Sequence, residues 1–331
     1  MGWDSDDISD TDGDSDTINY FDTDTESLQD NDTDTESPPT DDDIETWKFA
    51  VMGDSRDAIF GVNVQVLSKL VQAVIEQDVE LVIFTGDAVF GSYFVAAQLP
   101  SWLKVMEPLW DAGIKVYPGR GNHETQGINL NALAAWQNSF VKKRALPTNG
   151  PTGHKKVTYS VLHRNALFIS LDNYAGKTKV PQDWLDIQLA QMEVPHLFVY
   201  AHEPAFKLDH EDCLDDFPAK RDEFWQSLRE AGGRTYFCGH DHFYDHARVD
   251  DGDGNPDNDL HQFVVGTAGA PLYGWSPPYN GVNNGMTIEQ VSHVQGFGYV
   301  LGEVTGLDVT LTYISMKGEI KDSWSYTVDG F

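Results

Sequence analysis

The sequence predicts a layered α/β fold with mixed β-sheets, preceded by a polar tail. From residue 47 to residue 238, stretches with strand character alternate with stretches whose apolar residues recur at helical spacing. After residue 238 the predicted elements are strands only. Strand–helix alternation followed by strands is typical of layered α/β architectures in which parallel and antiparallel strands share a sheet.

The first half of the predicted fold contains three strands and three helices. Apolar residues recur at helical spacing over 62–76, which indicates an amphipathic helix. Residues 80–85 are dense in Val, Ile and Phe, as expected of a buried strand. The other elements predicted here are strands at 47–52 and 114–117, a helix at 95–111 broken by Pro108, and a helix at 129–140.

The second half begins with a predicted hairpin, 157–163 and 166–171, around Arg164 and Asn165. Pro181 begins a helix at 181–192, since proline is favoured at the first helical position. The remaining predictions are a strand at 196–200, a helix at 218–230, a strand at 234–238, and final strands at 261–266, 298–304, 308–314 and near 324–328.

Residues 1–45 form an acidic segment with few large apolar side chains. The net charge of the chain is −31, and residues 1–46 hold 18 of its 53 acidic residues and neither Lys nor Arg. Such a segment cannot bury enough apolar surface to offset the entropy of ordering, so 1–45 is expected to be a disordered low-complexity tail. Residues 46–331 are expected to form one folded domain.

Composition also limits the classes of partner. Nucleic-acid binding through phosphates needs clustered Lys and Arg, and an acidic chain without such a cluster argues against it. No stretch reaches the ~18 apolar residues of a membrane helix. Cys213 and Cys238 either pair or stay free, and two cysteines make no disulfide framework. No protein partner is indicated.

Five separate segments place metal-ligand side chains directly after a predicted strand. Ligands in open α/β sheets bind beyond the carboxyl ends of strands, so these segments are expected to meet in one crevice. Their mixture of oxygen and nitrogen donors suits Zn, Mn or Fe. The predicted ligands are Asp54, Asp87, Asn122, His202, His240 and His242.

This ordered set resembles the calcineurin-like metallophosphoesterases, including purple acid phosphatase-like members. The resemblance covers about residues 48–270, and its most specific parts are Gly-Asn-His-Glu at 121–124 and Gly-His-Asp-His at 239–242. It implies a four-layer α-β-β-α sandwich with two mixed sheets, a dinuclear metal site and phosphoester hydrolysis by domain 46–331.

The resemblance also assigns roles to the ligands. Asp87 would bridge the two metals. Asp54 and His242 would hold one metal. His123 would lie beside the phosphate without binding a metal, and would protonate the leaving group or stabilise charge. The other metal would take Asn122, His202 and His240.

The sequence departs from the family pattern at two positions. Arg56 stands where many members have a metal-binding His, and Phe90 stands where purple acid phosphatases have a Tyr ligand. Arg56 cannot bind a metal because its guanidinium stays protonated. It would either clamp a phosphate oxygen or pair with Asp57 or Asp87. Arg120 has the same two interpretations, as a substrate contact or as a structural ion pair.

The implied activity is hydrolysis by a hydroxide held between two metal ions, with a small phosphorylated substrate. Arg56 favours phosphomonoesters or nucleotide-type substrates, because it would neutralise an extra phosphate charge. The alternatives are a phosphodiesterase or pyrophosphatase, and a non-catalytic calcium-binding surface module. Asp241 and Glu124 are candidates for carboxylates that orient the ligand histidines, and Glu124 could equally be a carboxylate at the start of a helix.

Oxygen side chains recur at every second position after residue 250, a spacing that resembles calcium loops. The candidate calcium ligands are Asp251, Asp253, Asn255, Asp257 and Asp259. The alternative is a polar turn. A weak calcium site and the acidic tail favour export or the cell surface, although no secretory signal follows Met1, and otherwise the protein would be cytoplasmic. The aromatic run 271–285 would either cover the site or pack as a loop.

Overall fold

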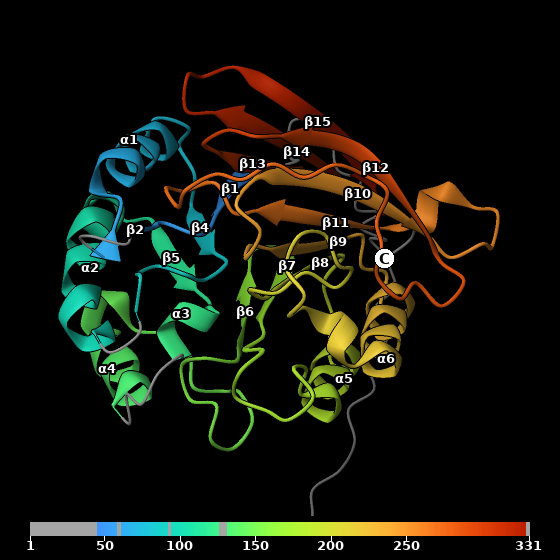
Figure 1. Cartoon of the computed structure of the whole chain (residues 1–331), viewed down its shortest axis with the longest axis horizontal. Coiled ribbons are helices and arrows are strands. Elements are labelled where there is room, and N and C mark those ends of the chain that lie inside the picture. The colour runs from blue at the N-terminus through green and yellow to red at the C-terminus, as the bar shows by residue number, and fades with distance from the viewer. Residues whose placement is uncertain (1–44, 58–60, 92–93, 126–130, 329–331) are drawn as a thin grey trace, which may run out of the picture. The chain divides into compact units, whose positions relative to one another are not determined.

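The computed structural model describes residues 45–57, 61–91, 94–125 and 131–328. Their helices and strands form four layers, with α1, α2 and α4 on one side, α5 and α6 on the other, and two β-sheets between them (Figure 1). The four-layer sandwich predicted from the sequence is therefore confirmed. The predicted acidic tail lies outside the described residues, except for Glu45. Among the described residues, no helix is both long and apolar enough to cross a membrane.

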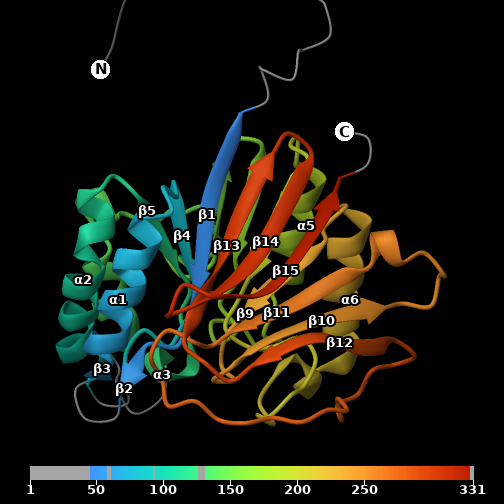
Figure 2. The same ribbon diagram turned by 90° about the horizontal axis from the view of Figure 1, so that it is seen from above.

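The first sheet has six strands in the order β15-β14-β13-β1-β4-β5 (Figure 2). β1, β4 and β5 are parallel, whereas β13, β14 and β15 continue the sheet antiparallel. The strands are β1 (Thr46–Met52), β4 (Leu81–Phe84), β5 (Lys115–Pro118), β13 (Gly298–Thr305), β14 (Asp308–Ser315) and β15 (Ile320–Thr327); a separate small ladder joins β2 (Arg56–Asp57) and β3 (Gly61–Val62).

The second sheet has seven strands in the order β12-β10-β11-β9-β8-β7-β6. β7, β8, β9 and β11 are parallel, and antiparallel strands lie at both edges. The strands are β6 (Tyr159–His163), β7 (Ala166–Ser170), β8 (His196–Tyr200), β9 (Thr235–Cys238), β10 (Tyr244–Asp250), β11 (Leu260–Val265) and β12 (Thr287–Val294). Both sheets are mixed, as the sequence predicts.

The helices bury one apolar face against a sheet. α1 begins after Asn63, whose side chain accepts a hydrogen bond from the Val66 amide. The helices are α1 (Val64–Ile75), α2 (Val95–Asp111), α3 (Asn122–Thr125), α4 (Ala132–Ser139), α5 (Gln182–Ala190) and α6 (Pro218–Glu230), with 3₁₀ turns at Lys142–Arg144, Leu214–Asp216 and Pro256–Asn258.

The predicted break at Pro108 is wrong, because α2 continues through both Pro100 and Pro108. Both prolines lie on the exposed face of the helix, where water can bond the carbonyls that lose a partner. The buried stripe on the opposite face runs through both halves and holds them together. Strands β10 and β12 were not predicted. Cys213 and Cys238 are both free and buried.

A layer of aromatic side chains lies between the two sheets. Phe49 of β1 packs on Phe168 of β7 and Phe198 of β8, with ring centroids 5.5 and 4.7 Å apart. The aromatic layer buries the faces of the two sheets that are turned toward each other. Two further apolar layers, between the sheets and the helices, bury the opposite faces. Rigid packing fixes the carboxyl ends of β1, β4 and β5 against those of β8 and β9.

Candidate metal centre

Polar side chains from five segments meet beyond the carboxyl ends of β1, β4, β5, β8 and β9. In one half of this centre, ligand atoms of Asp54, Asp87 and His242 all lie within 4.8 Å of one another. The His242 Nδ1 atom donates to the Pro271 carbonyl at 2.8 Å, so its Nε2 carries a lone pair. That Nε2 is buried, has no hydrogen-bond partner and lies 3.7 Å from Asp54 Oδ1.

The other half is built around His202. Its Nδ1 donates to the Thr85 carbonyl at 3.0 Å, so its Nε2 also carries a lone pair. Around this nitrogen lie Asn122 Oδ1 at 3.1 Å, His240 Nδ1 at 3.2 Å and Asp87 Oδ1 at 3.4 Å. The structure therefore brings all six predicted ligands together, with Asp87 between the two halves.

Electron-pair donors that face one another in a buried space repel each other unless a proton or a metal ion lies between them. Burial lowers the pKa of His202 to about 4, and burial followed by the nearby Arg56 charge lowers that of His242 to about 3. Both imidazoles are therefore neutral, which is the form that binds metals. Burial, reinforced by Asp87, raises the pKa of Asp54 well above its usual range. The unpaired lone pair of His242 Nε2 and the two adjacent carboxylates of Asp54 and Asp87 are the donors that a metal ion requires.

The ligand loops use unusual backbone conformations. Asp54, Asp87 and His240 have φ angles of 60°, 50° and 74°, in the left-handed region that non-glycine residues rarely adopt. A Cβ atom at Gly239 would lie 2.1 Å from Asp54 Oδ2, and one at Gly121 would lie 2.1 Å from Asp87 Oδ1. The motif glycines leave room for the ligand carboxylates, and the strained residues point them inward.

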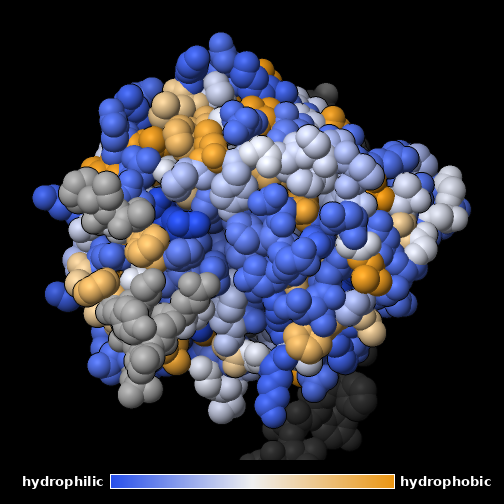
Figure 3. All heavy atoms as spheres, in the orientation of Figure 1, coloured by the Kyte–Doolittle hydropathy of each residue, from blue (hydrophilic) through white to orange (hydrophobic). Residues whose placement is uncertain are grey.

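His123 contacts Asp87 and belongs to α3, the short helix on the face turned toward the viewer in Figure 1. Its backbone amide donates to Asp87 Oδ1 at 3.0 Å, and its Nδ1 bonds the Phe90 carbonyl. Its Nε2 then faces Asp87 Oδ2 at 3.8 Å. The same face is largely hydrophilic across its centre (Figure 3), which suits a polar substrate.

The two arginines have different environments. Arg56 Nε lies 3.3 Å from Asp87 Oδ2, and its side chain is 18% exposed, so it reaches both the centre and the surface. Arg120 donates from Nε and Nη2 to Asp172 Oδ2 at 2.7 and 2.5 Å, and both side chains are buried. The contacts of Arg120 are those of a structural ion pair rather than of a substrate contact.

Glu124 ties two ligand loops together. Its carboxylate accepts hydrogen bonds from the amides of Asp87, Val89 and Gly121 at 2.8–3.0 Å. Burial and the Asp87 charge raise the pKa of Glu124 to about 8. Its hydrogen bonds are with backbone amides rather than with a ligand histidine, and it lies in the first turn of α3, which agrees with the second of the two interpretations from the sequence.

Asp241 differs from its predicted role. It accepts from the backbone amide and Nδ1 of His210, at 3.1 and 2.7 Å, and bonds no predicted ligand histidine. The His210 ring lies 4.1 Å from the His240 ring. Asp212 Oδ1 lies 3.1 Å from His240 Nε2 and so orients that ligand. Sequence reasoning missed His210 and Asp212; the polar run that follows His202 was the available signal.

The aromatic run 271–285 contacts the centre through the Pro271 carbonyl, which bonds His242, and through Tyr273. The Tyr273 hydroxyl donates to the His240 carbonyl at 2.9 Å, and its ring lies 4.3 Å from the His242 ring. Trp275 stacks on Phe243, away from the ligand nitrogens. The contacts of Trp275 are those of a packed loop, the second of the two interpretations from the sequence.

The predicted calcium loop brings together a different set of carboxylates. Ligand atoms of Asp250, Asp251 and Asp259 lie within 4.8 Å of one another. Asp259 is buried and neither of its carboxylate oxygens has a hydrogen bond, although Arg248 Nη1 lies 3.3 Å from its Oδ2. Arg229 contacts Asp251.

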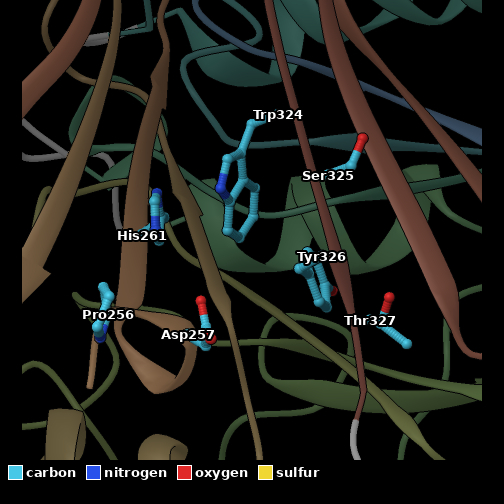
Figure 4. Close-up of a pocket in the computed structure, with 7 residues that line it drawn as sticks. All are labelled: Pro256, Asp257, His261, Trp324, Ser325, Tyr326 and Thr327. Atoms are coloured by element: carbon cyan, nitrogen blue, oxygen red, sulfur yellow. The ribbon is translucent and has the colours of Figure 1, made fainter.

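The other predicted calcium residues make local contacts. Asp253 and Asn255 accept from the backbone amides two residues further on, as in Asx turns. Asp257 instead borders a pocket of about 360 Å³ beneath the end of β15 (Figure 4). None of the six predicted metal ligands lines that pocket, whose walls are Pro256, Asp257, His261, Trp324, Ser325, Tyr326 and Thr327.

Several solved structures share this fold. The chain is similar to purple acid phosphatase PPD1 from yellow lupin, with a TM-score of 0.65 and 17% identity over 86% of this chain, but spans only 54% of the lupin protein. It is similar to GAP50 of Plasmodium, with a TM-score of 0.62 and 15% identity over 86% of this chain and 90% of the Plasmodium protein. It is also similar to a dimetal phosphatase from Danio rerio, with a TM-score of 0.55 and 14% identity over 86% of this chain and 99% of the Danio rerio protein.

No curated protein matches the chain significantly by sequence. The profile of the calcineurin-like phosphoesterases matches residues 48–244, which is more than half of the chain and contains all six predicted ligands. The match runs from β1 to the start of β10, so it spans the strands whose ends form the metal centre. The chain therefore belongs to the calcineurin-like phosphoesterase family.

Proposed function

We propose that this protein hydrolyses phosphomonoesters or nucleotide-type phosphates at a centre of two transition-metal ions, Zn, Mn or Fe. The observation that carries the proposal is the convergence of neutral imidazole lone pairs on buried carboxylates, with His242 Nε2 left without any partner. A buried polar atom of this kind is rare unless it serves a bound group.

The residues divide into two ligand sets that share Asp87. Bound ions would acidify water and offset the charge on the phosphoryl oxygens, which is the chemistry that such centres supply. No Ser or Cys nucleophile is then required. The first set is Asp54, Asp87 and His242, and the second is Asp87, Asn122, His202 and His240.

His123 would act on the leaving group. Its Nδ1 is held by the Phe90 carbonyl, and its Nε2 faces the centre beside Asp87. An imidazole fixed in this way can donate a proton to a departing oxygen or stabilise charge there. Neither role requires His123 to bind a metal.

Arg56 supports the preference for monoesters. A phosphomonoester carries one more negative charge than a diester, and a partly exposed guanidinium at the rim can bind one of its oxygens. The Arg56 side chain is 18% exposed and lies against the centre. A diesterase or pyrophosphatase is the alternative within the same chemistry.

The test compares hydrolysis of p-nitrophenyl phosphate and bis-p-nitrophenyl phosphate by the metal-loaded protein. We expect faster turnover of the monoester, and loss of at least ~100-fold in kcat for Asp87→Asn and His202→Ala. Asp308→Asn, at the opposite end of the first sheet, serves as the control. Equal rates for the parent and the two ligand variants would reject the proposal, and faster diester turnover would reject only the monoester preference.

The competing proposal is a non-catalytic module. One similar structure, GAP50, is described as the anchor in the inner membrane complex of Plasmodium, and an anchoring role of this kind is the basis of the alternative. Metal analysis separates the two proposals. About two transition-metal ions per chain support the enzyme, whereas none, or calcium alone, supports the module.

Calcium binding and export are proposals that do not depend on the metal centre. We propose that any calcium site at 250–259 uses Asp250, Asp251 and Asp259, because their oxygens converge. The unbonded, buried oxygens of Asp259 favour this set over the five predicted ligands. Export or a cell-surface location rests on the acidic tail together with this loop.

A further inference from the structure

The two halves of the metal centre differ in the number of protein ligands. The half formed by Asn122, His202, His240 and Asp87 has four, whereas the half formed by Asp54, Asp87 and His242 has three. We call the first the four-ligand half and the second the three-ligand half. Fewer protein donors provide a weaker metal site, other factors being equal.

The two oxygens of Asp87 already have different partners. Oδ1 faces the four-ligand half, 3.4 Å from His202 Nε2. Oδ2 lies 3.3 Å from Arg56 Nε and 3.8 Å from His123 Nε2. Arg56 Nε is buried without a hydrogen-bond partner, and it forms an ion pair with this oxygen. The guanidinium thus contacts the carboxylate oxygen with which Asp87 would bind an ion in the three-ligand half.

We propose that Arg56 sets the metal occupancy of the three-ligand half by competing with the ion for Asp87 Oδ2. This inference rests on the proposed function, because it assumes that both halves bind metals. A permanent positive charge beside the three-ligand half repels a second cation and neutralises part of the carboxylate charge that would attract it. The four-ligand half then fills first, and the three-ligand half fills only at higher metal concentration.

The same competition couples the second ion to the substrate. An ion that takes Asp87 Oδ2 frees the guanidinium, which is long enough and exposed enough to turn to a phosphate oxygen. A phosphate that holds Arg56 in turn leaves Asp87 Oδ2 to the ion. Binding energies are reciprocal, so inorganic phosphate must strengthen binding of the second ion by the factor by which that ion strengthens phosphate binding.

The experiment adds Zn²⁺ to the chelator-stripped full chain in a calorimeter, with metal content measured after desalting. The parent is expected to bind two ions in separate steps, with Kd values at least ~10-fold apart. His242→Ala should remove only the weaker step, and Asn122→Ala should weaken the tighter one. Saturating inorganic phosphate should tighten the weaker step in the parent.

Substitutions at position 56 test the competition itself. Arg56→Met removes the charge without adding a ligand atom, and Arg56→His removes the charge and adds an imidazole. The weaker Kd should tighten ~10-fold in Arg56→Met and further in Arg56→His, and phosphate should lose its effect in Arg56→Met. Lys69→Met, on the exposed face of α1, is the matched control.

The outcomes separate the two proposals. Two equal steps in the parent, or an unchanged weaker step in a folded Arg56→Met, would overturn the competition and leave the proposed function standing. No binding of Zn²⁺, Mn²⁺ or Fe²⁺ to the parent would instead overturn the proposed function. Far-ultraviolet circular dichroism establishes that each variant is folded before its binding is compared.

Discussion

Removal of the Arg120 guanidinium distinguishes its two interpretations. Arg120 and Asp172 form a buried pair in which Nε and Nη2 both donate to one carboxylate oxygen. Asp172 is 0% exposed, so loss of the arginine leaves an uncompensated charge in the interior. Breaking one side of a buried ion pair costs about 3–5 kcal/mol. For a domain of this size, about 2 °C per kcal/mol gives a fall in Tm of roughly 6–10 °C in Arg120→Met.

Differential scanning calorimetry and steady-state kinetics provide the assay. Adding Asp172→Asn to Arg120→Met should recover part of the lost Tm, because the amide keeps the hydrogen bond from the Tyr174 amide to residue 172 without a charge. Measured below the transition, KM for p-nitrophenyl phosphate should change little. An unchanged Tm together with a raised KM would refute the structural role and show that Arg120 binds substrate.

Three further predictions concern other parts of the chain. Burial and the nearby His246 lower the pKa of His261 to about 2, so below pH ~6.5 the unfolded chain binds an extra proton and stability falls by up to about 1.4 kcal/mol per pH unit. The free energy of unfolding, measured by urea titration between pH 7 and 5, should therefore depend less steeply on pH in His261→Gln than in the parent. Millimolar Ca²⁺ should raise the Tm of the parent, and Asp259→Asn should abolish that rise if the carboxylates bind calcium. Asp212→Asn should lower the affinity of the centre for Zn²⁺ about 10-fold in calorimetry, since the carboxylate orients His240.

The ligand set was predictable because each ligand belongs to a local pattern. Asp54 and Asp87 follow buried strands within three residues, and the histidines follow short strands of the second sheet. The rule that ligands gather beyond strand carboxyl ends then supplies the long-range contact without a structure. The layer order follows in the same way from strand–helix alternation.

Other features depend on tertiary contacts that no local pattern carries. β10 begins at Tyr244 and continues with Asp245 and His246. These two polar residues are buried because Tyr279 and Asp322 reach them from distant segments. His210 reaches the centre because Asp241 holds it. A sequence reader sees such residues as polar loop or surface, and only the packing of distant strands shows otherwise.

Glu124 shows why the fold and the metal centre are one structure. Its three hydrogen bonds join the loop after β4 to the loop after β5, so the position of Asp87 depends on a residue that binds no ion. The strained φ angles of the ligands are supported by such bonds and by the motif glycines. The position of each donor therefore depends on hydrogen bonds from residues that bind no ion, and the proposed difference between the two halves depends in the same way on the residue at position 56.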